Sequence, residues 1–184
     1  MNNGNTKKFY GKYRGTVINN VDPLKMGRIQ AIVPDVSNLI PTSFATPCVP
    51  ILGIQMGIFT VPQIGSGVWI EFENGDPDKP IWSGCFPGSA LDLPMSAQAI
   101  VPPIGGITLQ TTLQNALVVS DMPPAPAPPV MPPVVPVGGV TLKSATGASI
   151  VVNDAGIFIS NGKGATIMMV GPTITINNGA LVII

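Results

Sequence analysis

The stretch that decides the fold is GGITLQTTLQNALVVSD at residues 105–121, because GGVTLKSATGASIVVND at residues 138–154 repeats its pattern. The two copies share Gly-Gly, Thr, Leu, Val-Val and Asp at a constant offset of 33 positions. Apolar and polar residues alternate in each copy, which is typical of a strand with one buried face. The repetition predicts that both copies form the same pair of strands.

Short strands separated by small or turn-forming residues continue from residue 138 to the end of the chain. A segment of about 46 residues cannot close a core by itself, because segments below roughly 40 to 60 residues need a staple or an oligomer. Three identical chains wound round a common axis would enclose the apolar row, and a small single-chain sandwich or β-solenoid is the alternative. We predict that the core of a homotrimer consists of Val140, Leu142, Ile150, Val152, Ile157, Ile159, Ile167, Met169, Ile174 and Ile176.

The segment MPPAPAPPVMPPVVPV at residues 122–137 separates the two copies and contains eight prolines. Proline has no N–H to donate to a strand ladder and favours an extended path. We therefore expect this segment to leave the sheet as an outer loop or strap. A semi-rigid linker between two modules is the alternative.

The first half of the chain alternates strand-like runs with turn signals, as in YRGTVINN, GRIQAIVPDV, FATPCVPI, GVWIEFENG and KPIWSGC. In GVWIEFENG, the residues Val68, Ile70 and Phe72 fall on one face of a strand. The following Asn74 and Gly75 tolerate a positive φ, which favours a hairpin. No helical period extends over ten positions, so residues 11–88 are predicted to form a small closed barrel.

Composition limits the class of protein. The 184 residues include 21 Gly and 21 Pro, 45% are hydrophobic and 10% are charged, which is typical of an ordered, mainly β protein. A net charge of zero argues against a general nucleic-acid binder, because phosphate neutralisation needs excess Lys and Arg. Six of the nine basic residues lie in the first 28 positions and acidic residues follow, so two charged faces could meet different partners or each other.

The residues needed for common catalytic chemistry are missing. The chain has no His, which removes the commonest general base and every Ser-His or Cys-His nucleophile. The pairs Glu71 with Glu73 and Asp76 with Asp78 are more typical of a solvated face and of a turn. Cys48 and Cys85 form no metal-binding pattern and are predicted to be buried thiols, with a disulfide as the alternative. We therefore predict no enzyme activity, no cofactor and no metal site.

No apolar run approaches the roughly 20 residues that cross a bilayer, and the first residues contain no apolar signal core. We expect the protein to be synthesised in the cytoplasm and not exported by the ordinary secretory route.

The run GRIQAIVPDV at 27–36, followed by PQIGSGVWIEFENGDPDKPIWSGC at 62–85 and a Thr/Ile/Val/Gly strand repeat, resembles the central spike of contractile injection machines. This family includes the baseplate assembly protein V of contractile phage tails, the spikes of R-type bacteriocins and the valine-glycine-repeat protein of type VI secretion. The resemblance covers about Tyr13 to Ile184. It implies an all-β chain, with an N-terminal OB-fold barrel followed by a C-terminal triple-stranded β-helix, the needle, formed by a homotrimer. The implied domains are an arm at 1–10, the barrel at 11–88, a linker at 89–104, a first β-helix repeat at 105–121, a Pro-rich insert at 122–137 and the needle at 138–184.

The resemblance also implies a function. Such a spike is a structural component of a phage-like particle, either a virion baseplate or an extracellular injection device. It docks to the baseplate hub and pierces the target membrane when the sheath contracts. The candidate hub contacts are Lys7, Lys8, Lys12 and Arg14. Some related spikes hold iron at the tip through His, which this chain lacks, so a PAAR-type tip protein is expected to bind Leu181, Val182, Ile183 and Ile184.

Two other functions compete with this interpretation. The barrel could bind single-stranded nucleic acid or carbohydrate through Tyr10, Tyr13, Trp69 and Trp82 with the N-terminal lysines, although Glu71 and Glu73 share the face of Trp69. A passive trimeric fibre would carry exposed aromatic or charged contact residues, but Phe158 is the only aromatic residue after Phe86.

Overall fold

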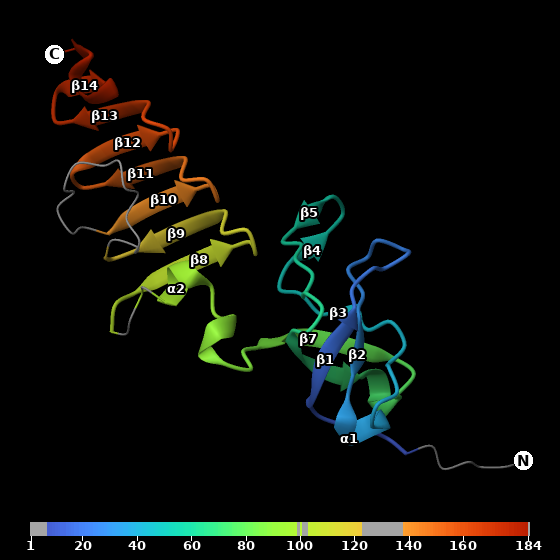
Figure 1. Cartoon of the computed structure of the whole chain (residues 1–184). Helices are drawn as coiled ribbons and strands as arrows, with labels where there is room; N and C mark the ends of the chain where they lie inside the picture. The colour runs from blue at the N-terminus through green and yellow to red at the C-terminus, as the bar shows by residue number, and fades with distance from the viewer. Residues whose placement is uncertain (1–6, 99, 101–102, 123–137, 184) are drawn as a thin grey trace, which may run out of the picture. The chain divides into compact units, whose positions relative to one another are not determined.

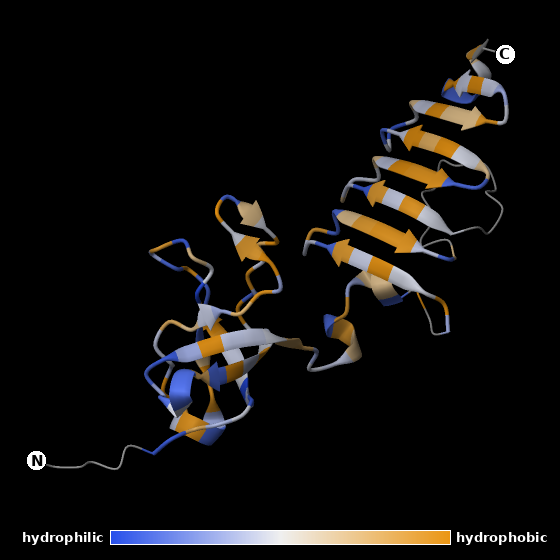
Figure 2. Cartoon of the chain, turned by 180° about the vertical axis from the view of Figure 1, so that it is seen from behind, coloured by the Kyte–Doolittle hydropathy of each residue, from blue (hydrophilic) through white to orange (hydrophobic). Residues whose placement is uncertain are grey.

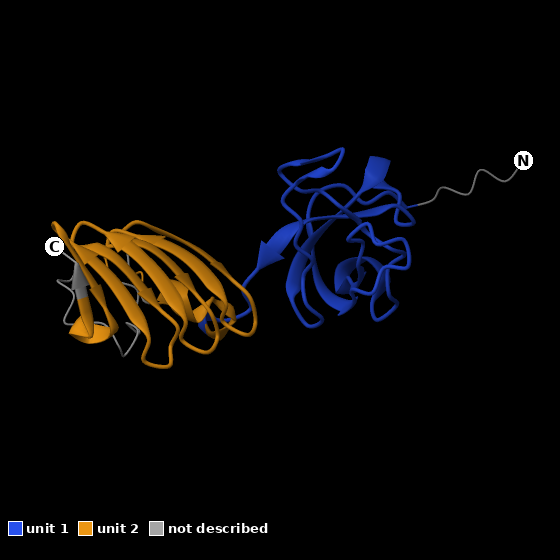
Figure 3. Cartoon of the chain, turned by 90° about the horizontal axis from the view of Figure 1, so that it is seen from above, with its two compact units in different colours: residues 1–90 blue, residues 91–184 orange. Residues whose placement is uncertain are grey.

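The computed structural model describes residues 7–98, 100, 103–122 and 138–183 of the chain. Two compact units are present, Met1–Ala90 and Leu91–Ile184 (Figure 3). Both units are built from strands, which confirms the predicted all-β class (Figure 1). Among the described residues, no helix is both long and apolar enough to cross a membrane.

The first unit is a five-stranded sheet that closes on itself. Its strands are β1 (Tyr13–Asn19), β2 (Gln30–Ile32), β3 (Thr46–Pro47), β6 (Gly67–Phe72) and β7 (Pro80–Phe86). They lie in the order β2-β1-β6-β7-β3. Next to the two outer strands, Ile29 and Ala45 exchange two backbone hydrogen bonds with N···O distances of 3.2 and 2.7 Å. These bonds join the sheet edges, so the predicted closed barrel is confirmed.

Alternation along β6 fills the barrel core. Val68, Ile70 and Phe72 are buried, whereas the residues between them are half-buried. Burial of each such side chain stabilises the fold by roughly 1.5–3 kcal/mol. The other buried core residues are Phe9, Val17, Ile29, Ala31, Val33, Ala45 and Trp82.

The connection between β6 and β7 is the predicted hairpin. Asn74 and Gly75 have φ values of 53° and 73°, and they lie in the short 3-10 turn η1 (Glu73–Gly75). The Asp76 carboxylate accepts a hydrogen bond from the backbone N–H of Asp78 at 3.1 Å. This contact fixes the turn, as predicted for Asp76.

Several short elements were not predicted from the sequence. The helix α1 (Pro34–Ser37) ends the run after β2, and β4 (Leu52–Gly53) pairs with β5 (Met56–Gly57) in a small separate hairpin. The helix α2 (Met95–Gln98) and the 3-10 turn η2 (Ala90–Asp92) lie in the predicted linker. Elements of two to four residues are too short to produce a periodic pattern.

The prediction of buried thiols is wrong, because Cys48 and Cys85 are free and exposed. Cys85 lies three positions after the buried Trp82 in β7, so the strand alternation turns its side chain away from the core. Cys48 follows the last residue of β3, where the paired strand has ended.

The second unit is one antiparallel sheet of eight strands (Figure 1). Each strand pairs with the next one along the chain. The strands are β8 (Gly106–Gln110), β9 (Ala116–Ser120), β10 (Gly139–Lys143), β11 (Ser149–Asn153), β12 (Gly156–Ser160), β13 (Thr166–Val170), β14 (Thr173–Ile176) and β15 (Leu181–Ile183), with the 3-10 turn η3 (Asn177–Gly179) between the last two.

The two copies of the repeated sequence form the same hairpin. The bounds of β10 and β11 are those of β8 and β9 shifted by 33, and the register Ile107↔Val119 recurs as Val140↔Val152. Their five-residue turns also match. The side-chain hydroxyls of Thr111 and Ser144 accept hydrogen bonds from the backbone N–H four residues later, at 3.2 and 3.1 Å. The predicted equivalence of the two copies is therefore confirmed.

A shorter period of 17 residues underlies the sheet. Strand β12 begins 17 residues after β10, and β13 begins 17 residues after β11. The offset of 33 exceeds this period by 16, which is the length of the segment 122–137. The structure pairs β9 directly with β10, so a linker between two separate modules does not fit this register. The predicted strap itself falls on residues 123–137, which lie outside the described residues.

Candidate functional site

The pairing register places all ten predicted trimer-core residues on one face of the eight-stranded sheet. Residues directly opposite each other share a face, and Val152 lies opposite both Val140 and Ile157. The same face continues into the first two strands and the last one. This apolar face consists of Ile107, Leu109, Leu117, Val119, Val140, Leu142, Ile150, Val152, Ile157, Ile159, Ile167, Met169, Ile174, Ile176 and Leu181. Hydrophobic residues recur in strand after strand of this unit in Figure 2.

Much of the apolar face is open to solvent in the single chain. Leu142 is 48% exposed and Ile107 is 64% exposed. Soluble monomers rarely expose contiguous apolar patches larger than a few hundred Å². A ladder of aliphatic side chains along eight strands therefore marks a surface that another chain covers.

The contribution of β8 and β9 to this face was missed at the sequence level. Ile107, Leu109, Leu117 and Val119 were not among the predicted core residues. The signal that could have found them is the offset of 33, which maps Ile107 onto Val140 and Leu117 onto Ile150.

The opposite face of the sheet is largely buried within the single chain. Val118 is fully buried and Phe158 is 4% exposed, and Thr141 lies between them in the central column of residues. At the first strand, α2 contacts β8, and the backbone N–H of Ser96 donates to Oε1 of Gln110 at 3.1 Å. The chain thus covers one face by itself and leaves the aliphatic face for a partner.

The candidate hub contacts are mostly engaged within the barrel. Lys12 forms an ion pair with Glu71 at 2.7 Å. Arg14 lies over the rings of Trp69 and Phe86, at 5.2 and 4.7 Å from their centroids. Lys7 lies 5.0 Å from the centroid of the Phe9 ring, and Lys8 is exposed. Basic and acidic stretches of the sequence therefore meet each other at least in part.

The aromatic residues proposed for base stacking do not form an exposed platform. Trp82 is buried, and its indole N–H donates to the carbonyl of Gly27 at 3.1 Å. Tyr13 packs against the rings of Phe9 and Phe72, and Trp69 lies under Arg14. Only Tyr10 among the four candidates is fully exposed, so this surface does not support single-stranded nucleic-acid binding.

The acidic candidates form no recognisable catalytic or metal site. Glu71 is paired with Lys12, and Asp76 holds its own turn. Within the described part of the chain, no three His, Cys, Asp or Glu side chains lie close enough together to hold a metal ion.

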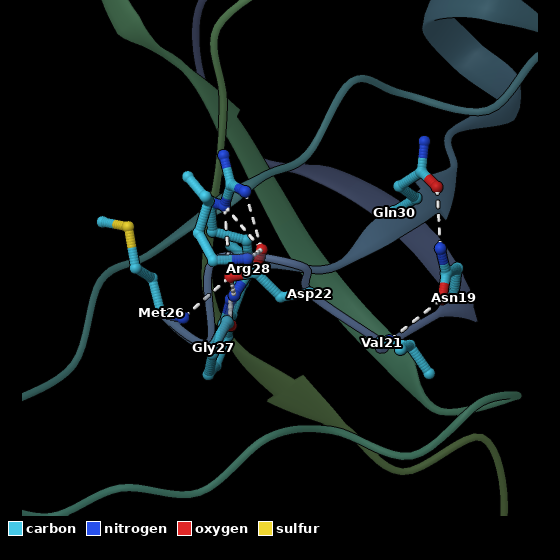
Figure 4. A network of polar contacts seen from close by, with 9 residues as sticks. Asn19, Val21, Asp22, Met26, Gly27, Arg28 and Gln30 are labelled. Atoms are coloured by element: carbon cyan, nitrogen blue, oxygen red, sulfur yellow. Dashed lines mark hydrogen bonds and ion pairs between the residues drawn. The ribbon is translucent and has the colours of Figure 1, made fainter.

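A polar cage rigidifies the loop between β1 and β2 (Figure 4). The buried Asp22 carboxylate accepts hydrogen bonds from the backbone N–H groups of Leu24, Met26 and Arg28, at 3.0, 2.8 and 3.3 Å. The Arg28 guanidinium donates to it at 2.6 Å and lies 5.0 Å from the centroid of the Phe44 ring. The Arg28 hydrogen bond, aided by the three N–H groups, holds the pKa of Asp22 well below its ordinary range. Sequence reasoning missed this cage, whose partners lie within six residues of each other.

We expect Asp22→Ala to lower the thermal unfolding temperature at pH 7 and to flatten its acid dependence. The folded-state pKa lies below the unfolded value of about 3.9, so the ionised carboxylate stabilises the fold above that pH. This contribution is lost as the pH falls below about 4 towards the folded-state pKa. Unfolding followed by circular dichroism from pH 2 to 7 measures it. Asp35→Ala, at an exposed carboxylate in α1, is the control, and equal effects of the two variants would contradict the cage.

Two family models match the chain. The model described as type VI secretion system/phage-baseplate injector OB domain matches residues 13–86. The model described as phage baseplate V C-terminal trimerisation domain matches residues 106–182. The first match covers the closed barrel, and the second covers the sheet that carries the apolar face. No curated protein matches the chain.

Proposed function

The chain belongs to the phage baseplate V spike family, and from this membership we propose that it is the membrane-piercing spike of a contractile injection particle. Its family role is that of a structural baseplate component, with an OB-fold barrel and a β-helical trimerisation domain. The observation that carries the proposal is the continuous apolar face, which lies on the segment that matches the trimerisation domain.

The homotrimer explains how the needle resists force. In a trimer, three apolar faces meet round the axis and leave water, which removes roughly 25 cal/mol per Å² of apolar surface from the cost of exposure. Closure also covers sheet edges that would otherwise pair with other chains. The strands are joined by backbone hydrogen bonds along the whole sheet, so the prism is stiff. The sheath supplies the work, and the needle transmits force to a small area of membrane without any enzymatic step.

The C-terminal end of the needle is the proposed site of a PAAR-type tip protein. Strand β15 is the last strand in the sheet order, and Leu181 is exposed there. Val182 and Ile183 belong to the same strand, and Ile184 lies outside the described residues. The four residues are proposed as the contact, because an exposed apolar end is typical of a surface that a partner covers.

The barrel is proposed to dock to the baseplate hub at the end of the tail tube. Among the four basic candidates, Lys12 and Arg14 already have contacts within the barrel. Lys7 and Lys8, which precede the buried Phe9, carry this part of the proposal. The particle that contains the spike would be a virion baseplate or an extracellular injection device, assembled from protein synthesised in the cytoplasm.

The proposal predicts that the needle is required for piercing and not for sheath contraction. Particles produced with a chain that stops at Ala90 should contract normally but should release no dye from target cells. Electron microscopy measures contraction, and dye efflux measures piercing, with particles that carry the full chain as the control. Full permeabilisation by particles with the shortened chain would contradict a piercing role.

A further inference from the structure

A second exposed apolar surface lies on the barrel and is not part of the needle. It consists of large side chains from the loop between β1 and β2 and from the segment that contains the β4–β5 hairpin. Ile54, at the tip of the hairpin, is 96% exposed. We name this surface the apolar collar, and its residues are Val21, Leu24, Met26, Ile51, Leu52, Ile54, Met56, Ile58, Phe59 and Ile64.

The two segments of the apolar collar lie side by side. A Cβ on Gly27 would lie 3.0 Å from Cε2 of Phe59. The side-chain amide of Asn20 donates to the carbonyl of Pro62 at 3.0 Å. Figure 1 shows the hairpin and the loop projecting from the same end of the barrel. The ten side chains therefore belong to one patch.

The size of the apolar collar is that of an interface between proteins. Ten large side chains, each more than half exposed, present on the order of 1,000 Å² of apolar surface, against about 300–600 Å² for the largest patch of a typical monomer. A standard interface buries about 800 Å² per partner. The patch is therefore large enough to hold a partner of its own.

The apolar collar is also ordered before any partner binds. Asp22 and Arg28 hold the loop in one conformation, and Trp82 fastens it to the core through the carbonyl of Gly27. Preorganised loops bind at a lower entropic cost than loops that must be ordered on binding. A rigid loop that presents exposed aliphatic side chains is typical of a docking surface.

The position of the apolar collar within the barrel indicates the partner. Gly67 lies opposite both Thr16, near the end of β1, and Phe86, where the chain leaves the barrel. The collar thus lies at the end of the barrel from which the chain continues to the trimerisation segment. The basic N-terminal arm lies at the other end, where the backbone N–H of Phe9 donates to Gly75. Trimerisation therefore brings three collars close to a common axis.

We propose that the apolar collar is a second interface between copies of this chain, through which the three barrels pack against one another. The inference rests on the trimer of the proposed function. A threefold interface is heterologous, so the loop of one barrel would contact the hairpin of the next. The needle holds the barrels at high effective concentration, so a contact of this size is stable even if it is weak between free barrels.

The test measures the protection of a thiol placed in the apolar collar of the full chain. Ile54→Cys is combined with Cys48→Ser and Cys85→Ser, which remove the two exposed native thiols. The control is Leu39→Cys in the same background, because Leu39 is 80% exposed and follows α1 at the opposite end of the barrel. In the trimer, we expect the thiol at position 54 to react with a maleimide at least tenfold more slowly than the thiol at position 39.

The outcomes separate this inference from the proposed function. Equal labelling rates in a protein of trimeric mass would overturn the collar interface alone. Fast labelling in the free trimer that becomes slow only in assembled particles would also overturn it, because another baseplate protein would then cover the collar. A monomeric mass for the full chain would overturn the needle trimer itself. Circular dichroism establishes that both variants fold, since both positions are on the surface.

Discussion

Ile159→Asp should convert the full-length trimer into monomers. Ile159 lies in the middle of the apolar face, directly opposite Ile150 and Ile167 on the neighbouring strands. In a trimer, three carboxylates would enter an apolar interior, where an unpaired charge is strongly unfavourable. Even truncation of a buried Ile to Ala costs about 2–5 kcal/mol, and the trimer contains three copies of the site. Light scattering at micromolar concentration should give 19.0 kDa for the variant and three times that mass for the parent.

The matched control for this variant is Asn153→Asp, which adds the same charge on the opposite face. The Asn153 side-chain oxygen accepts hydrogen bonds from the backbone N–H groups of Ala155 and Gly156 at 2.9 and 3.2 Å. An aspartate keeps both acceptors, so this variant should remain trimeric. If Ile159→Asp also retained the trimeric mass, the apolar face would not be the interface between chains.

Gly156→Ala should prevent the needle from folding. Gly156 begins β12 with a φ of 152°, and a Cβ at this position would lie 2.2 Å from the carbonyl oxygen of Met169. Real Cβ atoms essentially never approach another atom below 3.0 Å, so β12 and β13 would have to separate. Strained φ values cost about 1–3 kcal/mol each, and every lost hydrogen bond adds about 1 kcal/mol. Gly139, one period earlier, approaches Val152 in the same way, so Gly139→Ala should behave alike.

Gly171→Ala is the control for the glycine variant. Gly171 also has a positive φ, at 54°, but a Cβ there would meet no atom within 4 Å. Left-handed backbone costs about 1–2 kcal/mol for an ordinary residue, so this variant should fold with a modestly lower unfolding temperature. Thermal unfolding followed by far-UV circular dichroism compares the two. Equal unfolding temperatures would mean that the close approach of the strands at Gly156 is not essential.

The needle face could be predicted from the sequence because a period of two determines the side of a sheet directly. Once Val140 and Leu142 were placed on one face, the register followed from strands of equal length and turns of similar length. The same reasoning placed Val68, Ile70 and Phe72 in the barrel core. Alternation cannot tell which chain covers a face, so the trimer had to come from the size of the uncovered apolar row.

The apolar collar and the Asp22 cage could not be predicted in this way. Ile54 and Phe59 look like core residues in a sequence, yet they are held outside the barrel by a hairpin of two-residue strands. Asp22 and Arg28 form their cage only because the loop between them folds back, which no periodicity encodes. Cys85 was misplaced because free cysteines are usually buried, whereas its position in β7 turned it outward.

The 17-residue period of the second unit makes the needle a ruler. Each period adds one hairpin, which is two strands, and neighbouring strands lie about 4.8 Å apart, so every unit lengthens the ladder by about 10 Å. The apolar face is continued by each added unit without any new kind of contact. Duplication of residues 139–155 would therefore yield a longer needle with the same cross-section, and deletion of one unit a shorter one. Reach towards a target surface can thus vary in fixed steps while the barrel stays unchanged.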